Sequence, residues 1–403
     1  MGANIRIFAD DPDGSVALQV FSLAELEPFR RAKIRVMPDA HVGKGCVIGF
    51  TANVTDAVIP NVVGVDVGCG VFAVKIEEEA SIELLRRLDE AAHKCIPVGQ
   101  DVHGSVQISK KELASYECAQ GFRNKTHLAA SLGTLSGGNH FIELDQVNDG
   151  ELWLVVHTGS RGIGSQLASF WQRVAVKQRQ GATRNQRQEL ISRLKKAGLA
   201  NRIESEMKRL GESQLLEINE DCCWLDGCEK DGYLHDMALA QDFAHRNRIR
   251  IVELLAEASG VRLSNQFVES VHNYIDLDAG VIRKGAISAR KRERVIIPLN
   301  MAQGCVLGVG LGNDDWNRSA PHGAGRVMSR REAFRELTMD SYRDSMRGVY
   351  STTVCEETLD EAPMAYKDAG FILGSLAKTV EVECVMRPLW NFKATKQFGN
   401  CRK

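Results

Sequence analysis

The sequence has no hydrophobic run that approaches the roughly 18 consecutive apolar residues of a membrane-spanning helix. Its first residues, from Met1 to Ile7, also lack the basic region and apolar core of a signal peptide. Arg6 occupies the position where a myristoylation motif needs Ser or Thr. These absences exclude the obvious routes to a membrane, and we therefore expect a cytoplasmic protein with no membrane partner.

The sequence also lacks an excess of either charge, since 51 Lys and Arg residues face 52 Asp and Glu residues for a net charge of -1. A global basic field that drives non-specific nucleic-acid binding is excluded, so any nucleic-acid contact must be a local patch. The segment 184–208 is rich in Lys and Arg and is either a solvated helical face or an RNA-facing surface. The absence of a Gly-x4-Gly-Lys-Ser/Thr string disfavours a P-loop nucleotidase.

The 11 cysteines are odd in number and irregularly spaced, which favours reduced and mostly buried thiols over disulfides. One cluster, formed by Cys222, Cys223, Cys228 and His235, loosely resembles a zinc site. It has no Cys-x-x-Cys pair, so buried helical thiols are the favoured interpretation.

The chain has 403 residues, of which 44% are hydrophobic, and its length alone allows two or three domains. It contains no Pro-, Ser- or Gly-rich linker, low-complexity tract or clear repeat. β-Branched runs predict strands at 45–50, 62–75, 152–157, 294–299, 306–311 and 380–386. Helical periodicity predicts helices at 166–179, 184–210, 234–257 and 330–338. The candidate chemical residues lie on both sides of this helical block, which predicts one domain over 1–403 with a helical insertion at about 165–260.

The string from Gly64 to Gly70 places Asp66 and Cys69 three residues apart among glycines. A carboxylate and a thiolate together suit a borderline divalent ion such as Mn, Fe, Co or Zn better than Mg. A tight turn with a buried Cys is the alternative for this string taken alone.

Three histidines follow or end apolar or Gly-rich segments, where a strand would deliver a side chain to a cleft: His140, His157 and His272. Each is a candidate metal ligand, although a satisfied core or loop His is the commoner outcome. His41 is a further candidate, because Gly43 and Gly45 beside it suggest close approach to a ligand. Turn geometry explains these two glycines equally well. Four other histidines lie in charged or polar segments and are predicted at the surface: His93, His103, His127 and His245.

A second string, from Pro321 to Arg326, puts His322 before a Gly-Ala-Gly turn. Glycines at this position let backbone N–H groups approach phosphate oxygens without a side-chain clash. The two strings together therefore suggest metal-assisted phosphoryl or nucleotidyl transfer with His322 as the nucleophile.

Seven motifs in order, spanning about Met37 to Lys393, resemble the RtcB-type RNA ligases. They are Met37-Pro-Asp-Ala-His41, Gly64-Val-Asp-Val-Gly-Cys-Gly70, Gly137-Gly-Asn-His-Phe-Ile-Glu143, His157-Thr-Gly-Ser-Arg-Gly-Ile-Gly164, Arg283-Lys-Gly-Ala286, His322-Gly-Ala-Gly-Arg326 and Ala365-Tyr-Lys367. Any one of them is a weak signal, but their combination in one chain is highly specific.

The resemblance implies an α+β fold of mixed β-sheets around a metal cleft, and a GTP- and Mn-dependent enzyme that joins RNA ends. One end carries a 3′-phosphate or a 2′,3′-cyclic phosphate, and the other carries a 5′-hydroxyl. His322 is then the guanylylated residue. Two Mn ions would be held by Asp66, Cys69, His140, His157 and His272. The implied GTP contacts are Asn139, His140, Phe141, Ile142, Glu143, His272, Asn273, Pro298, Leu299, Asn300, Met301, Cys305, His322, Gly323, Ala324, Gly325, Tyr366 and Lys393.

The positive groups expected for RNA phosphates are Arg161, Lys284, Arg326 and Arg330. A structural ion pair is the alternative for each, and a structural Tyr is the alternative to a guanine contact for Tyr366. Some relatives serve tRNA splicing and others RNA repair, and an archease or a release-factor-like protein is a possible partner.

The sequence departs from the family pattern at three places. Cys305 replaces a Ser expected near the guanine, Pro321 precedes the nucleophile, and residues 394–403 extend past the usual end and could crowd the guanine pocket. A metal-dependent cyclic phosphodiesterase and a catalytically silent RNA-binding protein remain the alternative functions.

Overall fold

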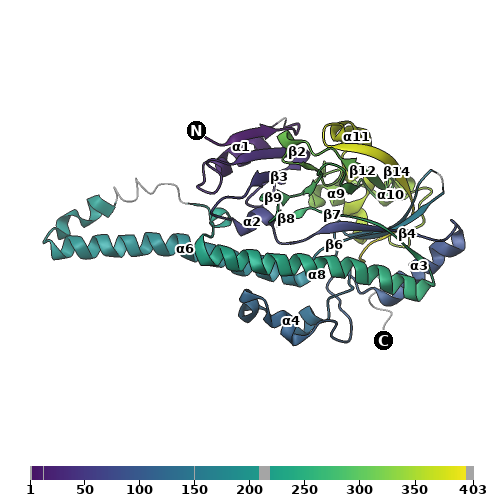
Figure 1. Cartoon of the computed structure of the whole chain (residues 1–403), viewed down its shortest axis with the longest axis horizontal. Coiled ribbons are helices and arrows are strands. Elements are labelled where there is room, and N and C mark those ends of the chain that lie inside the picture. Colours follow the sequence, from purple (N-terminus) through teal and green to yellow (C-terminus); the bar gives the residue numbers. More distant parts are fainter. Residues whose placement is uncertain (1, 12, 149, 208–217, 396–403) are drawn as a thin grey trace.

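The computed structural model describes the chain except residues 1, 12, 149, 208–217 and 396–403, and the side chains of 180–187. It combines long helices with three β-sheets, which confirms the α+β prediction. Figure 1 shows the sheets gathered on one side of a long pair of helices. Among the described residues, no helix has both the length and the apolarity needed to cross a membrane.

The largest sheet has seven strands in the order β11-β12-β14-β5-β6-β4-β7, and all neighbours in it are antiparallel. The sheet curls until its edge strands meet, and there the backbone N–H of Ile296 donates to Ser270 Oγ at 2.9 Å. Its strands come from both sides of the helical block in the sequence. Their bounds are β4 Gly70–Ile76, β5 Phe141–Gln146, β6 Leu152–Thr158, β7 Leu263–Val271, β11 Arg294–Pro298, β12 Cys305–Gly310 and β14 Val380–Phe392.

A five-stranded sheet, in the order β1-β2-β3-β9-β8, and a two-stranded sheet, β10-β13, complete the β structure. Among the strand pairs in the described residues, β1–β2 alone is parallel. Their bounds are β1 Asn4–Ile7, β2 Lys33–His41, β3 Ile48–Asn53, β8 Asn273–Asp276, β9 Val281–Lys284, β10 Ala286–Ser288 and β13 Ser319–Pro321.

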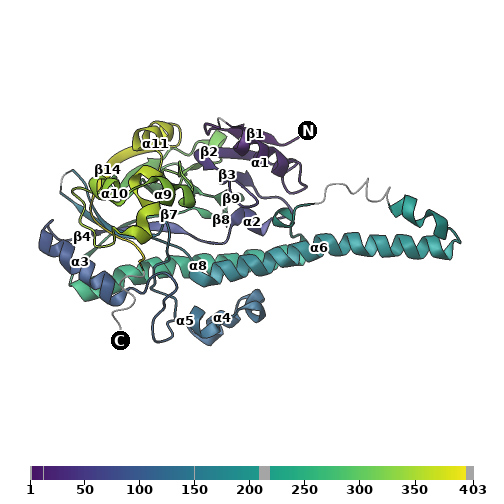
Figure 2. The same cartoon turned by 180° about the vertical axis from the view of Figure 1, so that it is seen from behind.

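The helical block consists of α6 (Arg161–Lys196) and α8 (Gly227–Ser259), which lie side by side beneath the sheets. The end of α6 projects beyond the rest of the molecule (Figures 1 and 2). The predicted break between helices 166–179 and 184–210 is therefore wrong, because one helix, α6, runs through Gly181 and ends only at Lys196. A single Gly inside a helix costs only about 1 kcal/mol, which the rest of the helix can offset. Residues 208–210 of the predicted second helix lie outside the described residues.

The prediction of one strand over 62–75 is also wrong. The helix α2 (Pro60–Val63) ends there, and β4 begins only at Gly70. Between them Gly64 and Gly68 adopt φ values of 97° and 73°. These left-handed conformations interrupt a strand and create the loop that carries Asp66 and Cys69.

The shorter helices flank the sheets, and several have side-chain caps. Ser81 caps α3 by accepting from the Leu84 N–H, and Ser329 forms a capping box with Glu332 at the start of α9. The apolar faces of α3 and α8 cover one face of the large sheet, as Leu88 and Ile251 share a core cluster with Leu154. Bounds are α1 Ser15–Ala24, α3 Ile82–Cys95, α4 Lys110–Ala114, α5 Lys125–Ala129, α9 Arg330–Glu336, α10 Met339–Ser345 and α11 Ala369–Leu376.

The described cysteines are free thiols, as expected, but only five of them are buried: Cys46, Cys69, Cys118, Cys223 and Cys305. Cys228 is exposed. Within the described part of the chain, the residues around Cys222 and His235 do not form a group with metal-ligand spacing.

Candidate functional site

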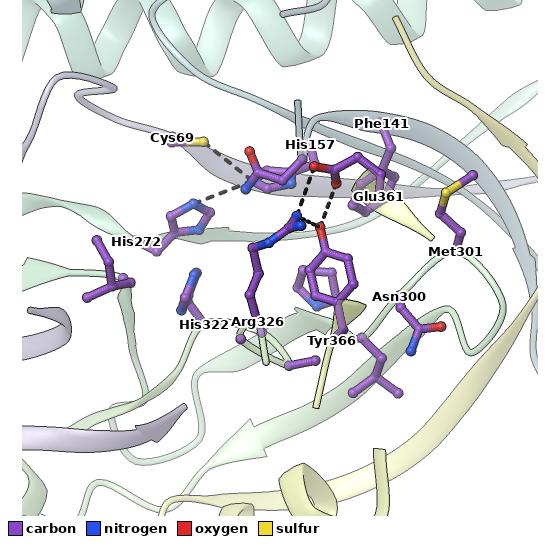
Figure 3. A pocket seen from close by; sticks show the side chains of 18 of the residues that line it. Cys69, Phe141, His157, His272, Asn300, Met301, His322, Arg326, Glu361 and Tyr366 are labelled. Carbon is purple, nitrogen blue, oxygen red and sulfur yellow. Dashed lines mark hydrogen bonds and ion pairs between the residues drawn. The ribbon is translucent and has the colours of Figure 1, made fainter. Parts of the chain in front are cut away.

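A cavity of about 320 Å³ opens between the large sheet and the five-stranded sheet, and residues from most of the predicted motifs line it. Figure 3 shows Cys69, His157 and His272 on one side of it and Tyr366 and Glu361 on the other. Arg326 lies between these two groups, and His322 lies next to His272. The cavity therefore brings together residues that are hundreds of positions apart in the sequence.

Asp66 and Cys69 lie in the loop between α2 and β4, and the Cys69 N–H donates to the Asp66 carbonyl at 3.1 Å. Gly68 makes this turn possible. Its φ is 73°, and a Cβ there would lie 2.9 Å from the Cα of Gln241 on α8. The tight turn points both side chains towards the same place.

The three predicted histidine ligands come from the ends of three strands of the large sheet, β5, β6 and β7. His140 precedes β5, His157 is near the end of β6, and His272 follows β7. Cys69 Sγ lies 3.2 Å from His140 Nε2 and 3.4 Å from His157 Nε2. His157 Nε2 is 3.4 Å from His272 Nε2, and His140 Nε2 is 3.0 Å from an Asp66 carboxylate oxygen.

This cluster has the chemistry and spacing of a metal centre. Metal–nitrogen and metal–sulfur bonds of about 2.0–2.3 Å place neighbouring ligand atoms about 3.4 Å apart around one tetrahedral ion. The observed separations match that spacing, and Cys69, His140 and His157 form one of two compact metal-ligand groups among the described residues. The mixture of carboxylate, thiol and imidazole suits a borderline divalent cation.

The ionisation of the cluster also fits a cation. Burial, with help from neighbouring imidazoles, lowers the pKa of His157 well below its usual value, and burial likewise lowers the pKa of His272. Both rings are therefore neutral and have a lone pair to offer. Burial and the Asp66 carboxylate raise the pKa of the Cys69 thiol, so a bound cation must displace its proton.

His322 follows β13 and presents its ring to the same cavity, 4.9 Å from the ring of His272. An Asp39 carboxylate oxygen lies 2.7 Å from His322 Nδ1 and accepts the His322 backbone N–H at 3.2 Å. In the neutral ring, this contact with a carboxylate places the proton on Nδ1 and leaves Nε2 with a free lone pair. Asp39 is fully buried on β2 and belongs to the Met37–His41 motif, although it was not predicted as a site residue.

The opposite side of the cavity is organised around the buried carboxylate of Glu361. Lys393 Nζ and Arg326 Nη1 each lie 3.1 Å from it, and the Tyr366 hydroxyl donates to it at 2.5 Å. Burial alone would raise the pKa of Glu361, but Lys393, Tyr366 and Arg326 hold it below its usual value. Arg326 also donates to two backbone carbonyls, those of Asp360 and Met328.

Strand β5 shows how the sheet selects which residues face the cavity. Phe141 and Glu143 line it, whereas Ile142 points the other way into the core beside Leu144. This follows from the alternation of side chains along a strand. Ile142 is therefore placed away from the cavity, and only its backbone remains near the predicted nucleotide contacts.

Glu143 is buried at the wall of the cavity, where Cys305 Sγ donates to it at 3.2 Å and Asn391 Nδ2 at 2.8 Å. Cys305, the departure from the family pattern, lies behind Glu143 and not among the lining residues. Burial raises the pKa of Glu143 to about 7.

Most of the other predicted nucleotide contacts share the same cavity. His140 lies in the metal-ligand cluster but does not line the cavity itself. The predicted residues that do line it are Asn139, Phe141, Glu143, His272, Asn273, Pro298, Leu299, Asn300, Met301, His322, Gly323, Ala324, Gly325, Tyr366 and Lys393.

Two of the four predicted phosphate-binding cations are placed elsewhere. Arg161 donates to Thr134 Oγ1 and to the Gly99 carbonyl, both at 2.7 Å, and so supports the loop that leads to His140. Lys284 Nζ donates to the carbonyls of Lys44 and Asn61. Neither lines the cavity, whereas Arg326 and Arg330 do.

The other histidines considered above also divide into those that line the cavity and those that do not. His41 lines the cavity, and burial lowers its pKa. His93, His103, His127 and His245 do not line it, and each is partly buried. Of the C-terminal extension, 396–403 lie outside the described residues, and Thr395 lines a different hollow with Phe392.

Two buried polar residues of α8 support the metal-ligand loops and were not predicted. Arg248 donates to the carbonyls of Gly68 (2.8 Å) and Thr158 (2.7 Å), next to Cys69 and His157. Asn247 bonds the backbone of Thr134 and Gly159. Their sequence context is an ordinary amphipathic helix, so no local pattern marks them.

The fold and the site define an α+β protein with a candidate metal centre beside a histidine that is held with one nitrogen free. A sequence model of the family described as tRNA-splicing ligase RtcB matches residues 19–130 and 117–394. The chain belongs to this family.

Individual relatives match over nearly their whole length. The chain is 31% identical to the RNA-splicing ligase RtcB of Escherichia coli (strain K12), covering 92% of this chain and 91% of that protein. It is 26% identical to the tRNA-splicing ligase RtcB of Aeropyrum pernix, covering 90% and 89% respectively. The corresponding protein of Thermococcus kodakarensis is 25% identical, with 90% and 88% covered.

Proposed function

We propose that this protein is an RNA ligase that joins a 3′-phosphate or 2′,3′-cyclic phosphate end to a 5′-hydroxyl end, with GTP as the energy source. The observation that carries the proposal is the juxtaposition of His322, fixed by Asp39, with the cluster of Asp66, Cys69 and three histidines. Family membership supports it, since relatives are named as RNA-splicing and tRNA-splicing ligases.

In the first step His322 Nε2 attacks the α-phosphorus of GTP, a P–N bond forms, and pyrophosphate leaves. Asp39 keeps the proton on Nδ1 and stabilises the positive charge that the ring develops. Gly323 and Gly325 line the cavity, and a Cβ on Gly325 would lie 2.6 Å from the Asp39 carbonyl oxygen, so this turn needs glycine to pack against β2.

Asp66, Cys69, His140, His157 and His272 would hold divalent metal, for which we propose two Mn ions. Divalent metal in this place screens phosphate charge and stabilises charge on the leaving group.

The guanine would lie on the far side of the cavity, near Glu143 and Tyr366. Glu143 offers carboxylate oxygens to ring N–H donors, and the Tyr366 ring is fixed by its hydrogen bond to Glu361. Lys393, buried between Glu361 and the carbonyl of His140, ties this wall to the metal-ligand side.

Two further displacements complete the reaction. An oxygen of the RNA 3′-phosphate attacks the phosphorus on His322, the P–N bond breaks, and an RNA end activated with GMP forms. The 5′-hydroxyl of the second RNA then attacks the RNA phosphorus, loses its proton, and displaces GMP. A cyclic phosphate must first be opened by water to a 3′-phosphate.

The first prediction tests the nucleophile. Protein incubated with Mn²⁺ and α-labelled GTP should become covalently labelled, and His322→Ala should abolish labelling because no other lone pair replaces Nε2. His245→Ala, which removes a half-buried His outside the cavity, is the matched control. Labelling that survives His322→Ala would rule out this nucleophile, and RNA-end hydrolysis without labelling would favour a phosphodiesterase.

A further inference from the structure

A second hollow, of about 610 Å³, lies against α6 next to the candidate site. One wall is formed by the exposed side chains of Ser169, Arg173 and Lys177 on α6. The facing residues include Lys44, Asn61 and Val65. We refer to these six residues as the α6 groove, and Figure 1 shows α2, which carries Asn61, directly beside α6.

The α6 groove shares a wall with the catalytic cavity. Val65 directly precedes Asp66, which lines the cavity. The buried Lys284 lies behind both, since its Nζ donates to the carbonyls of Lys44 (3.0 Å) and Asn61 (2.9 Å) and its neighbour Gly285 lines the cavity. The two hollows are therefore neighbours, separated by the segment that carries Val65 and Asp66.

Arg173 and Lys177 are exposed cations that form no ion pair with any residue in the described ranges. Arg179, two residues further along α6, is instead paired with Asp226. The two groove cations are four residues apart, which on a helix is a rise of about 6 Å on one face. That rise is comparable to the distance between consecutive phosphates of an extended RNA strand.

The groove also contains the acidic residues Glu220 and Asp221, and Glu220 lies against α6, where Gln172 Nε2 donates to its carbonyl at 2.6 Å. Asp221 is already engaged, 3.4 Å from Lys44 Nζ and accepting from Asn61 Nδ2 at 3.1 Å. These carboxylates repel phosphate, so RNA binding in the groove depends on the cations Arg173 and Lys177.

We propose that the α6 groove binds the sugar–phosphate backbone of single-stranded RNA adjacent to the end that is joined. Arg173 and Lys177 contact successive phosphates, while Ser169, whose hydroxyl donates to the Ser165 carbonyl at 2.8 Å, lines the groove one turn closer to the start of α6. Lys284 is a positioning residue, because it holds the backbone of Lys44 and Asn61 and not the RNA. The proposal rests on the proposed function for its ligand, and not on the identity of the nucleophile.

The test replaces both cations, Arg173→Ala with Lys177→Ala, and measures the dissociation constant for single-stranded RNA across a range of salt. Loss of two phosphate contacts should weaken binding at low salt. It should also make the slope of log K against log salt shallower by about 1.4. The charge-preserving pair Arg173→Lys with Lys177→Arg should keep the slope of the unmodified protein.

Lys110→Ala with Lys111→Ala is the matched control, because it removes the same charge from exposed residues of α4. Figures 1 and 2 show α4 on the side of the α6–α8 pair away from the sheets. An unchanged slope in the groove variant, or an equal change in the control, would overturn the proposal.

Label transfer from GTP without RNA separates the two proposals and reports on folding. The groove variant should be labelled like the unmodified protein, since neither cation lines the catalytic cavity. Absence of labelling in the unmodified protein would contradict the proposed function, while the RNA-binding slopes would still decide the groove. Normal labelling with unchanged RNA binding would contradict the groove alone.

Discussion

Glu143 is the residue whose charge bears most directly on the proposed nucleotide recognition. It is buried, it lines the cavity, and burial raises its pKa to about 7. A carboxylate can accept hydrogen bonds from the guanine only when it is ionised, so its useful form is populated above this pKa. The neighbouring Asp145, buried behind it, also has a raised pKa through burial and the proximity of Glu143.

We therefore expect GTP affinity to rise as the pH increases from 6 to 8, by up to about tenfold as Glu143 ionises. Glu143→Gln should weaken GTP binding by about 10- to 100-fold, the value of a hydrogen bond to a charged group, and remove this pH dependence. Equilibrium binding of GTP and ATP at several pH values checks both effects. ATP, which lacks the guanine N–H donors, should respond little, and an equal loss for both nucleotides would refute the assigned contact.

At the residue scale the structure also separates the cations that line the cavity from those that support its loops. Arg161 and Lys284 donate to carbonyl and hydroxyl oxygens of loops around the site. Arg330, by contrast, has its side chain half exposed at the cavity and only long ion pairs of 3.8–3.9 Å to Asp360 and Glu361. It is therefore the predicted phosphate-binding residue with the most freedom to reach RNA.

At the scale of elements, the strands of the large sheet supply the ligands and α8 fixes the loops between them. Arg248 has no exposed surface and joins Gly68 on one ligand loop, Thr158 at the end of β6, and Glu269 on β7. Removing such a side chain leaves several buried acceptors without a donor.

We expect Arg248→Met to lower the free energy of unfolding by about 3–5 kcal/mol, because it breaks a buried ion pair from one side. Metal affinity should fall with it, since the Cys69 loop loses its support. Denaturant unfolding and Mn²⁺ titration measure the two effects. The matched control is Arg246→Met on the same helix, whose ion pairs with Glu112 and Asp242 are partly exposed and worth about 0–1 kcal/mol. Similar losses in both variants would contradict the role given to Arg248.

At the scale of the whole molecule, the candidate metal centre brings together four separate parts of the chain. They contribute Asp66 with Cys69, His140, His157 and His272. A cation that binds only the folded chain stabilises it by mass action. The centre should therefore act as a cross-link between the ligand loop, the large sheet and the strand β8 that follows His272.

We expect Mn²⁺ at about 100 times its dissociation constant to stabilise the fold by about 2.7 kcal/mol. Cys69→Ser should remove most of this effect, because a neutral hydroxyl replaces the thiolate. Thermal unfolding with and without Mn²⁺, together with elemental analysis, provides the measurement. Cys228→Ser, at an exposed cysteine, should keep the full metal-dependent shift. The same shift in Cys69→Ser would show that the thiol is not a ligand.

The sequence by itself determined the chemistry that the chain can offer. The residue types and spacing of Asp66 and Cys69, the histidines near strand ends and the Gly-rich string after His322 all carry local signals. The main strands β6, β11 and β12 and the helix α8 were also predictable, because apolar periodicity is a local property. The boundary of β4 was not, because Gly64 and Gly68 break the strand only where their left-handed conformations are needed.

Only the tertiary structure decided which of these residues meet and what each one does. Asp39 reaches His322 across 283 positions, and Arg248 reaches Gly68 across 180. The inward placement of Arg161 and Lys284 likewise depends on carbonyl groups of distant loops. No local pattern encodes such contacts, since they arise when sheets and helices pack and buried donors must find acceptors.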